Sequence, residues 1–133
     1  MHEDSILLVD KPANMTSFGV VARIRRRLSQ QLGKKAKVGH TGTLDPFATG
    51  LMIIVTGKEC RNAMQYSKLD KEYEATIRLG QTSTTGDPEG EVTDVSEVRP
   101  TRDEAEAALV AFRGEISQTP PIYSAIKVNG QRA

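Results

Sequence analysis

Residues 39–55 read GHTGTLDPFATGLMIIV, a loop of small residues that runs directly into a continuous apolar stretch. The loop, residues 39–50, holds three glycines, three threonines and a single carboxylate, that of Asp45. The apolar run that follows, residues 51–55, predicts a buried strand closed by Thr56 and Gly57. Two interpretations of the loop remain open: a tight turn in which Asp45 caps its own backbone, or a pre-shaped functional site around one carboxylate.

On the N-terminal side, the apolar run 6–9 predicts a buried strand that stops at Pro12. Thr16 or Ser17 is expected to cap a helix, and Gly33 to end it. Spacings of three, four and four residues place one apolar stripe along that helix, made of Val21, Ile24, Leu28 and Leu32.

On the C-terminal side, we expect a short helix at 59–66, a half-buried strand at 71–79, a polar loop at 80–90 and a short strand at 91–95. A capping box from Thr101 to Glu104 predicts a helix with a purely structural apolar stripe at Ala105, Ala108, Leu109 and Phe112. Residues 123–128 predict a last strand, followed by a hairpin turn at Asn129 and Gly130. These elements predict an α+β fold, with a mixed, largely antiparallel sheet flanked by helices.

The bulk composition suits one soluble domain, residues 1–133. Hydrophobic residues make up 38% of the chain and charged residues 26%, and no apolar run approaches a membrane span. The N-terminus lacks the pattern of a secretory signal, and the single cysteine, Cys60, suits a reducing cytoplasm. With two histidines and one cysteine, the sequence predicts no structural metal.

Charge is unevenly distributed along the chain. Residues 22–40 hold seven Lys or Arg and no acid, whereas residues 86–106 hold eight acids and two Arg. The basic stretch is either a solvated helix face or a surface for phosphates. Its candidates for contact with an RNA backbone are Arg23, Arg26, Arg27, Lys34, Lys35 and Lys37.

Three chemical interpretations of the loop can be compared. A phosphate cradle of the P-loop type is not favoured, because Gly50 is followed by Leu51 and not by Lys. An aspartyl-phosphate loop resembles residues 40–44, but Gly39 stands where its nucleophile belongs. Asp45 as a nucleophile that attacks carbon remains, with small neighbours that leave room for a flat ligand. The loop supplies no second carboxylate, so a glycosidase-type pair is not indicated.

Five sequence motifs of this chain, taken in their order along it, resemble those of the TruB family of tRNA pseudouridine synthases. The catalytic motif is similar to residues 37–50, and the N-terminal Lys-Pro element to residues 10–17. Residues 71–75 resemble the tyrosine motif, residues 79–90 the next stretch, and residues 118–127 the Pro-Pro-x-Tyr-Ser-Ala-x-Lys element. The resemblance covers nearly the whole chain and is closest to the stand-alone bacterial enzymes.

The resemblance implies the pseudouridine synthase fold and a function, the isomerisation of uridine to pseudouridine at position 55 in the T-stem-loop of tRNA, without cofactor or metal. It implies that Asp45 is the nucleophile, attacking either the sugar or the base. His40 and Thr43 would contact the substrate, Tyr73 would stack on the target base, and Lys11 would brace the loop. A flipped base requires an aromatic face, although Tyr73 alone is equally well an ordinary strand residue.

The chain departs from the family pattern in two places. Asn14 stands where the family usually has Gly, and residues 57–61 replace the more usual Gly-x-Ala-Thr-Lys. The family continues with a motif whose Arg pairs with the catalytic Asp, and with an RNA-binding domain, so we expect this chain to be the N-terminal portion of a synthase, incomplete at its C-terminus. A monomer that binds tRNA is expected. The alternative function is a tRNA-binding or tRNA-folding module without catalysis.

Overall fold

The structure, a computed structural model, describes residues 1–124 and 127–132, and divides the chain into two compact units. The first unit is Met1–Tyr73 and the second is Glu74–Ala133. Each unit combines helices with antiparallel strand pairs, so the predicted α+β class is confirmed.

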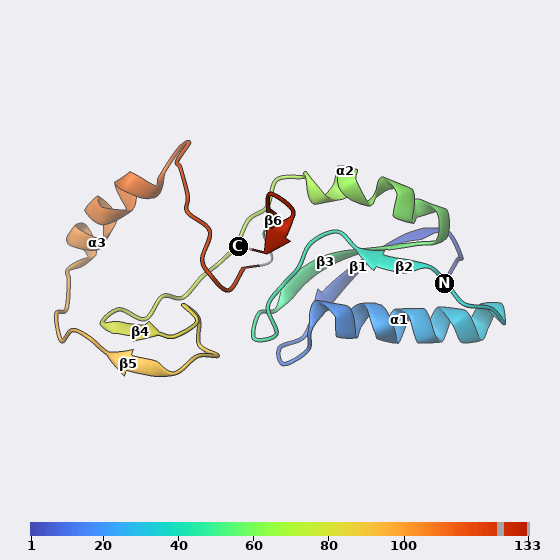
Figure 1. The fold of residues 1–133 in the computed structure, drawn as a ribbon, viewed down its shortest axis with the longest axis horizontal. Helices are drawn as coiled ribbons and strands as arrows, with labels where there is room; N and C mark the ends of the chain where they lie inside the picture. Colours follow the sequence, from blue (N-terminus) through green and yellow to red (C-terminus); the bar gives the residue numbers. More distant parts are fainter. Residues whose placement is uncertain (125–126, 133) are drawn as a thin grey trace. The chain divides into compact units, whose positions relative to one another are not determined.

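The first unit is built on a three-stranded antiparallel sheet in the order β1-β3-β2 (Figure 1). Its strands are β1 (Ser5–Lys11), β2 (Val38–His40) and β3 (Gly50–Thr56). The helical elements are α1 (Ser17–Leu32), the 3₁₀ helix η1 (Gly57–Asn62) and α2 (Ala63–Ser67). Prediction from sequence missed β2, whose three residues include Gly39 and carry no apolar period of their own. The single short helix predicted at 59–66 is observed as η1 followed by α2.

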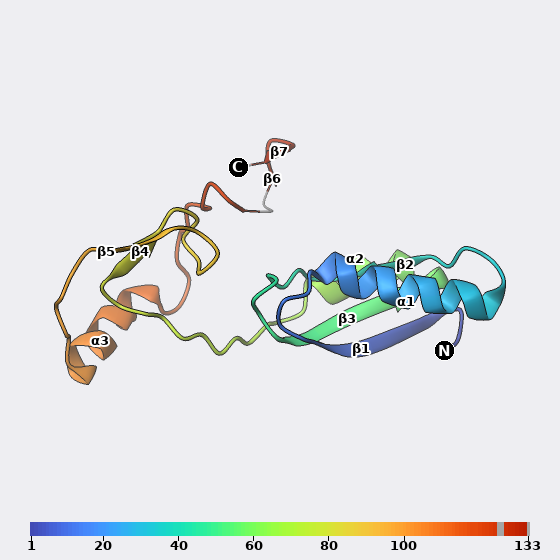
Figure 2. The ribbon, with the colours of Figure 1, turned by 90° about the horizontal axis from the view of Figure 1, so that it is seen from below.

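Helix α1 covers one face of this sheet, as Figure 2 shows. Val21 and Leu28 of α1 pack against Met52 and Ile54 of β3. The predicted limits of α1 are confirmed, because the Thr16 side chain accepts a hydrogen bond from the Gly19 amide and Gly33 ends the helix at φ 67°. The stripe is therefore the inner face of α1.

The opposite face of the sheet corrects one prediction. The runs 6–9 and 51–55 are predicted to be buried strands, yet Leu8 is 69% exposed and Leu51 is 65% exposed. Successive strand residues point to opposite faces, and α1 covers only one of them. A continuous apolar run predicts two covered faces, but sequence cannot supply the layer that would cover the second.

The turn after β3 requires glycine. Gly57 has φ 56°, and a Cβ atom there would lie 2.6 Å from the Glu3 carbonyl oxygen and against the Asp4 side chain. The Gly57 amide also donates to the Lys37 carbonyl oxygen at 2.9 Å, so the backbone cannot easily shift.

Gly57→Ala is therefore expected to lower the free energy of unfolding by about 2 kcal/mol, the combined result of a left-handed backbone and a close contact. Denaturant titration followed by circular dichroism measures the change. Gly42→Ala is the control, because a Cβ at Gly42 meets no atom within 4 Å. Equal stability of the two variants would contradict this account of Gly57.

The second unit consists of small elements with little mutual burial. They are β4 (Gln81–Ser83), β5 (Val92–Asp94), α3 (Arg102–Leu109), η2 (Val110–Phe112), β6 (Lys127–Val128) and β7 (Gln131–Arg132). The strands form two antiparallel hairpins, β4-β5 and β6-β7. The predicted polar loop at 80–90 thus contains β4, and the predicted strand at 91–95 is confirmed as the shorter β5.

One strand prediction in this part of the chain is wrong, and a second is confirmed only in part. Residues 71–79 form no strand, and all nine are exposed. Alternation alone did not suffice, because a strand also needs a neighbour for its hydrogen bonds and a surface to cover one face. The strand expected at 123–128 exists only at Lys127–Val128: Tyr123 and Ser124 lie outside it, and residues 125–126 are not among the described residues.

Local signals in the second unit predicted local structure well. The capping box of α3 is present, with hydrogen bonds between Thr101 and Glu104 in both directions. The hairpin turn at Asn129 and Gly130 is also confirmed, with φ 53° and 81°. The apolar stripe of α3 is not buried as expected, since Phe112 is 71% exposed.

The loop between β4 and β5 is held by an ionised carboxylate. Hydrogen bonds from the Thr85 hydroxyl and the Glu89 amide lower the pKa of Asp87 below its ordinary value of 3.8. Because folding lowers this pKa, the ionised Asp87 carboxylate stabilises the loop fully at pH values above its ordinary pKa. This stabilisation is lost as the pH falls through the pKa of the folded state.

An NMR titration of the Asp87 carboxyl carbon is expected to show its midpoint below 3.8, moving up toward that value in Thr85→Val. An unchanged Asp87 midpoint in Thr85→Val would refute the hydroxyl as the main cause.

Candidate active site

The loop that carries Asp45 joins β2 to β3 across the edge of the first unit's sheet. His40 is the last residue of β2, and Gly50 is the first of β3, with φ 130°. At the start of the loop, the Thr41 amide donates to the Ile53 carbonyl oxygen at 3.1 Å. Both ends of the loop are thus anchored on the central strand.

Ser17, the first residue of α1, holds the loop immediately before Asp45. Its hydroxyl donates to the Leu44 carbonyl oxygen at 2.8 Å and accepts from the Leu44 amide at 2.9 Å. Ser17 is buried, and the Leu44 side chain packs against the core. Because one hydroxyl bonds both the amide and the carbonyl group of Leu44, the backbone on either side of the Leu44 Cα atom is held in place.

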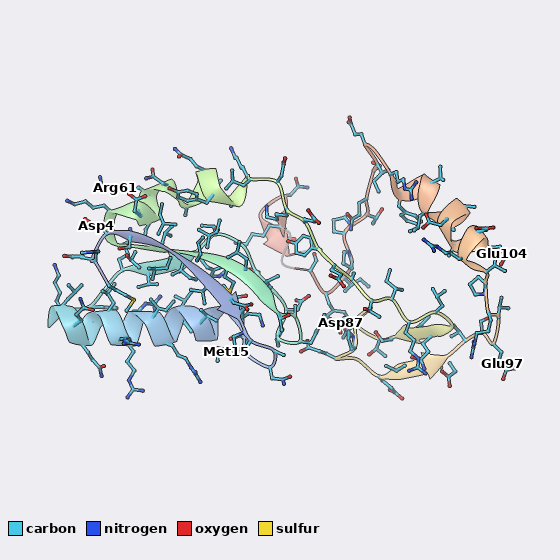
Figure 3. The ribbon with its side chains drawn as sticks, turned by 180° about the vertical axis from the view of Figure 1, so that it is seen from behind. Asp4, Met15, Arg61, Asp87, Glu97 and Glu104 are labelled. Carbon is cyan, nitrogen blue, oxygen red and sulfur yellow. The ribbon has the colours of Figure 1, made fainter. Side chains whose placement is uncertain are left out.

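Lys11, the last residue of β1, holds the loop immediately after Asp45. Its side chain is completely buried, and its ammonium donates to the carbonyl oxygens of Pro12, Met15 and Pro46 at 2.9, 2.8 and 3.2 Å. Met15, labelled in Figure 3, lies just before the start of α1. One buried cation therefore ties the β1–α1 connection to the Asp45 loop.

Asn14 completes this attachment. Its amide donates to the Pro46 carbonyl oxygen at 2.7 Å, and its φ is 62°. Left-handed backbone favours Gly and tolerates Asn better than most other residues. The geometry therefore explains why Asn14 can stand at a position where the sequence pattern favours Gly.

The Asp45 side chain is free, although its backbone is fixed. The Asp45 carbonyl oxygen accepts from the Ala48 amide at 3.0 Å, which closes a tight turn through Pro46. Within the described residues, the exposed carboxylate has no hydrogen bond and no ion pair. The turn interpretation is thus confirmed for the backbone, whereas the carboxylate caps nothing and stays available to a ligand.

The other expected substrate contacts lie in different settings. His40 is half-buried, and its Nδ1 lies 2.9 Å from the Gly42 carbonyl oxygen, so Nδ1 carries the hydrogen. Its Nε2 has no hydrogen-bond partner among the described residues. Thr43 is exposed on the loop, two residues before Asp45. Tyr73 is 67% exposed at the end of the first unit and makes no hydrogen bond or ring contact with the rest of the described chain.

The six basic candidates differ in what surrounds them. Figure 3 shows nitrogen-tipped side chains that project from α1 away from the sheet. Arg23, Arg26 and Arg27 of this helix are exposed. Lys34 is already paired, 2.7 Å from Glu3, and this hydrogen bond raises the pKa of Lys34 above its ordinary value. Lys35 and Lys37 are exposed.

The roles of three residues near the loop and the basic residues were not predicted from the sequence. Ser17 was considered only as a helix cap, and Asn14 only as a departure from a pattern. Arg25 was missed, because helical spacing places it beside the apolar stripe. It lies next to a groove of about 350 Å³, lined by Arg25, Lys35, Ala36, Lys37 and Val38, which we call the Arg25 groove.

Two further observations concern the described residues only. They contain no group of three or more His, Cys, Asp or Glu side chains placed to hold a metal ion. None of their helices is long and apolar enough to span a bilayer.

The chain is therefore an α+β protein whose candidate site has one exposed carboxylate, that of Asp45, on a loop with a fixed backbone. A helix rich in arginine supplies a cationic surface in the same unit. The family model that matches the chain is that of the TruB family pseudouridylate synthase (N terminal domain), over residues 26–133. The chain belongs to the TruB family.

Curated relatives match over almost all of the chain. It is 50% identical over 128 residues to tRNA pseudouridine synthase B of Opitutus terrae, covering 96% of the chain and 51% of that protein. It is 50% identical over 130 residues to the protein of the same name from Gluconacetobacter diazotrophicus, covering 98% of the chain and 41% of that protein. The Caulobacter sp. K31 protein is 48% identical, with shares of 96% and 39%. The chain thus spans about half the length of these relatives, or less.

Proposed function

We propose that the chain takes part in the isomerisation of uridine to pseudouridine in tRNA, at position 55 of the T-stem-loop, with Asp45 as the nucleophile. The observation that carries this proposal is the state of Asp45, a free, exposed carboxylate on a peptide held from both sides. The names of the relatives supply the substrate class and the reaction.

The reaction needs what this loop offers. The bond between C1′ of the ribose and N1 of uracil breaks, the base turns, and a bond forms between C1′ and C5. C5 then loses its proton, and N1 takes up a proton in its place. The atoms of uridine are conserved, so no oxidant or further group is consumed. A carboxylate that attacks either the sugar or the base forms a temporary bond to carbon, and a fixed backbone holds it at the reacting atom.

The neighbouring residues take supporting roles in this proposal. A uridine inside a folded RNA loop must leave its stack to reach Asp45. The unbonded Nε2 of His40 and the exposed hydroxyl of Thr43 are available to hold the displaced RNA. Tyr73 offers an exposed aromatic face, and stacking on a base contributes roughly 1–3 kcal/mol. Lys11 positions the loop from behind and, being buried, contacts no substrate in this arrangement.

The same proposal extends to the domain, the oligomeric state, the location and the partner of the protein. Both units belong to one catalytic domain with the pseudouridine synthase fold, which acts as a monomer in the cytoplasm and uses no cofactor. Its partner is the T-stem-loop of tRNA, approached by the basic residues of α1 and of the segment that follows it.

The test is tritium release from a T-stem-loop RNA that carries uridine labelled at C5. It is run on the 133-residue chain and on a hybrid in which this chain replaces the matched segment of the Opitutus terrae relative. Release by the hybrid is expected. A hybrid that folds and binds the RNA without releasing tritium would contradict the proposal, and would favour a tRNA-binding or tRNA-folding module instead.

A further inference from the structure

The Arg25 groove gathers three cationic side chains from two segments of the first unit. Arg25 comes from the middle of α1, and Lys35 and Lys37 come from the segment that leads into β2. Among the described residues, no acidic side chain lines the groove. Within the described part of the chain, none of the three cations has an ion-pair partner, in contrast to Lys34 with Glu3.

The backbone of the groove is fixed. The Ala36 amide donates to the Ser29 hydroxyl at 2.9 Å, and the Ala36 side chain is buried in the core. The Lys37 carbonyl oxygen accepts from the Gly57 amide at 2.9 Å. Because Ala36 points inward and both of its neighbours are exposed, the two lysines are presented by a rigid segment.

Arg25 is fixed as well. Its Nη2 donates to the Val38 carbonyl oxygen at 3.2 Å, and its guanidinium lies 5.8 Å from the centre of the Phe18 ring. One of its five N–H groups is thus used by the backbone, and the others remain for a ligand. A planar guanidinium held in this way matches the oxygens of a phosphate.

We propose that the Arg25 groove binds a backbone phosphate of the RNA substrate, and that Arg25, Lys35 and Lys37 form this subsite. Arg25 lies eight residues after Ser17, which at about 1.5 Å per residue places the groove roughly 12 Å along α1 from the Asp45 loop. This separation spans a few nucleotides, so the subsite holds RNA beside the target uridine and not at it. The inference rests on the proposed function, because it takes the same RNA as ligand.

The proposed subsite also predicts which basic residues contribute most to binding the phosphate. Lys35 and Lys37 face the ligand without a competing carboxylate, whereas Glu3 already partly neutralises Lys34. Arg23, Arg26 and Arg27 line no part of the groove and, at spacings of three and four residues, share a different face of α1.

The experiment measures the affinity of the 133-residue chain for a fluorescein-labelled T-stem-loop hairpin RNA between about 50 and 200 mM salt. The variant is Lys35→Gln with Lys37→Gln; Arg25 stays, because it also holds the Val38 carbonyl. The control, Arg61→Gln with Lys68→Gln, removes two exposed cations of the same unit that do not line the groove.

For the loss of one phosphate contact, we expect the slope of log K against log salt to flatten by about 0.7 to 0.9, and the affinity at about 0.1 M salt to fall roughly fivefold or more. The control is expected to keep the wild-type slope. In the tritium assay with the hybrid, the groove variant is expected to raise KM and leave kcat unchanged.

An unchanged slope in the groove variant, or an equal change in the control, would overturn the subsite and leave the proposed function standing. Complete displacement of the RNA by inorganic phosphate at matched ionic strength would also overturn it, since the groove would then be a site for free phosphate. Absence of any salt-dependent binding by the wild-type chain would overturn both. Tritium release that fails while the groove effect persists would overturn only the proposed chemistry.

Discussion

Asp45→Asn is expected to abolish pseudouridine formation by the hybrid enzyme while leaving RNA affinity and thermal unfolding unchanged. Removing a nucleophile costs roughly 10⁴-fold or more in rate, because the amide cannot form the temporary bond to carbon. Stability is unaffected, because the carboxylate is exposed and has no partner within the described residues. The substitution also preserves the Asp45 carbonyl oxygen, which closes the turn with Ala48.

Tritium release, RNA affinity and the melting temperature are measured on the same preparations. Asp70→Asn is the matched control, since it removes one exposed carboxylate from the first unit at a distance in sequence from the loop. Release by Asp45→Asn at the wild-type rate would eliminate Asp45 as the nucleophile. A large fall in melting temperature would contradict the description of its side chain as free.

Lys11→Met is expected to destabilise the first unit and to release the Asp45 loop. Met preserves the length and apolar volume of the side chain but removes three hydrogen bonds to carbonyl oxygens. Those oxygens stay in place when their donor is removed, although the Pro46 oxygen keeps a second donor, the Asn14 amide. We expect a loss of about 2–4 kcal/mol in the free energy of unfolding.

For a unit of this size, such a loss corresponds to a fall of roughly 8 °C or more in the melting temperature. Hydrogen exchange at the Leu44 and Ala48 amides reports the loop directly, because both are hydrogen-bonded on either side of Asp45. Faster exchange there than at the Ile54 amide, in the middle of β3, is expected. Lys58→Met, at an exposed lysine, is expected to change neither quantity, and an equal effect of both variants would refute a special role for Lys11.

Sequence alone determined the local elements of the first unit. The stripe of α1, its cap at Thr16 and its end at Gly33 depend on residues within one or two turns of each other, so spacing is sufficient information. The same holds for the capping box at Thr101 and for the Asn129–Gly130 turn. The loop around Asp45 was recognised as a candidate site because its glycines, threonines and single carboxylate are contiguous.

Only the tertiary structure decided what surrounds these elements. The strand expected at 71–79 is absent, and Leu8 and Leu51 are exposed, because burial needs a covering layer that periodicity cannot specify. The attachment of the Asp45 loop depends on Lys11 and Ser17, from two other elements, and the Arg25 groove on a contact between α1 and the approach to β2. Sequence thus identified the carboxylate, whereas the hydrogen bonds that fix its peptide and leave its side chain free arise from residues brought together only by folding.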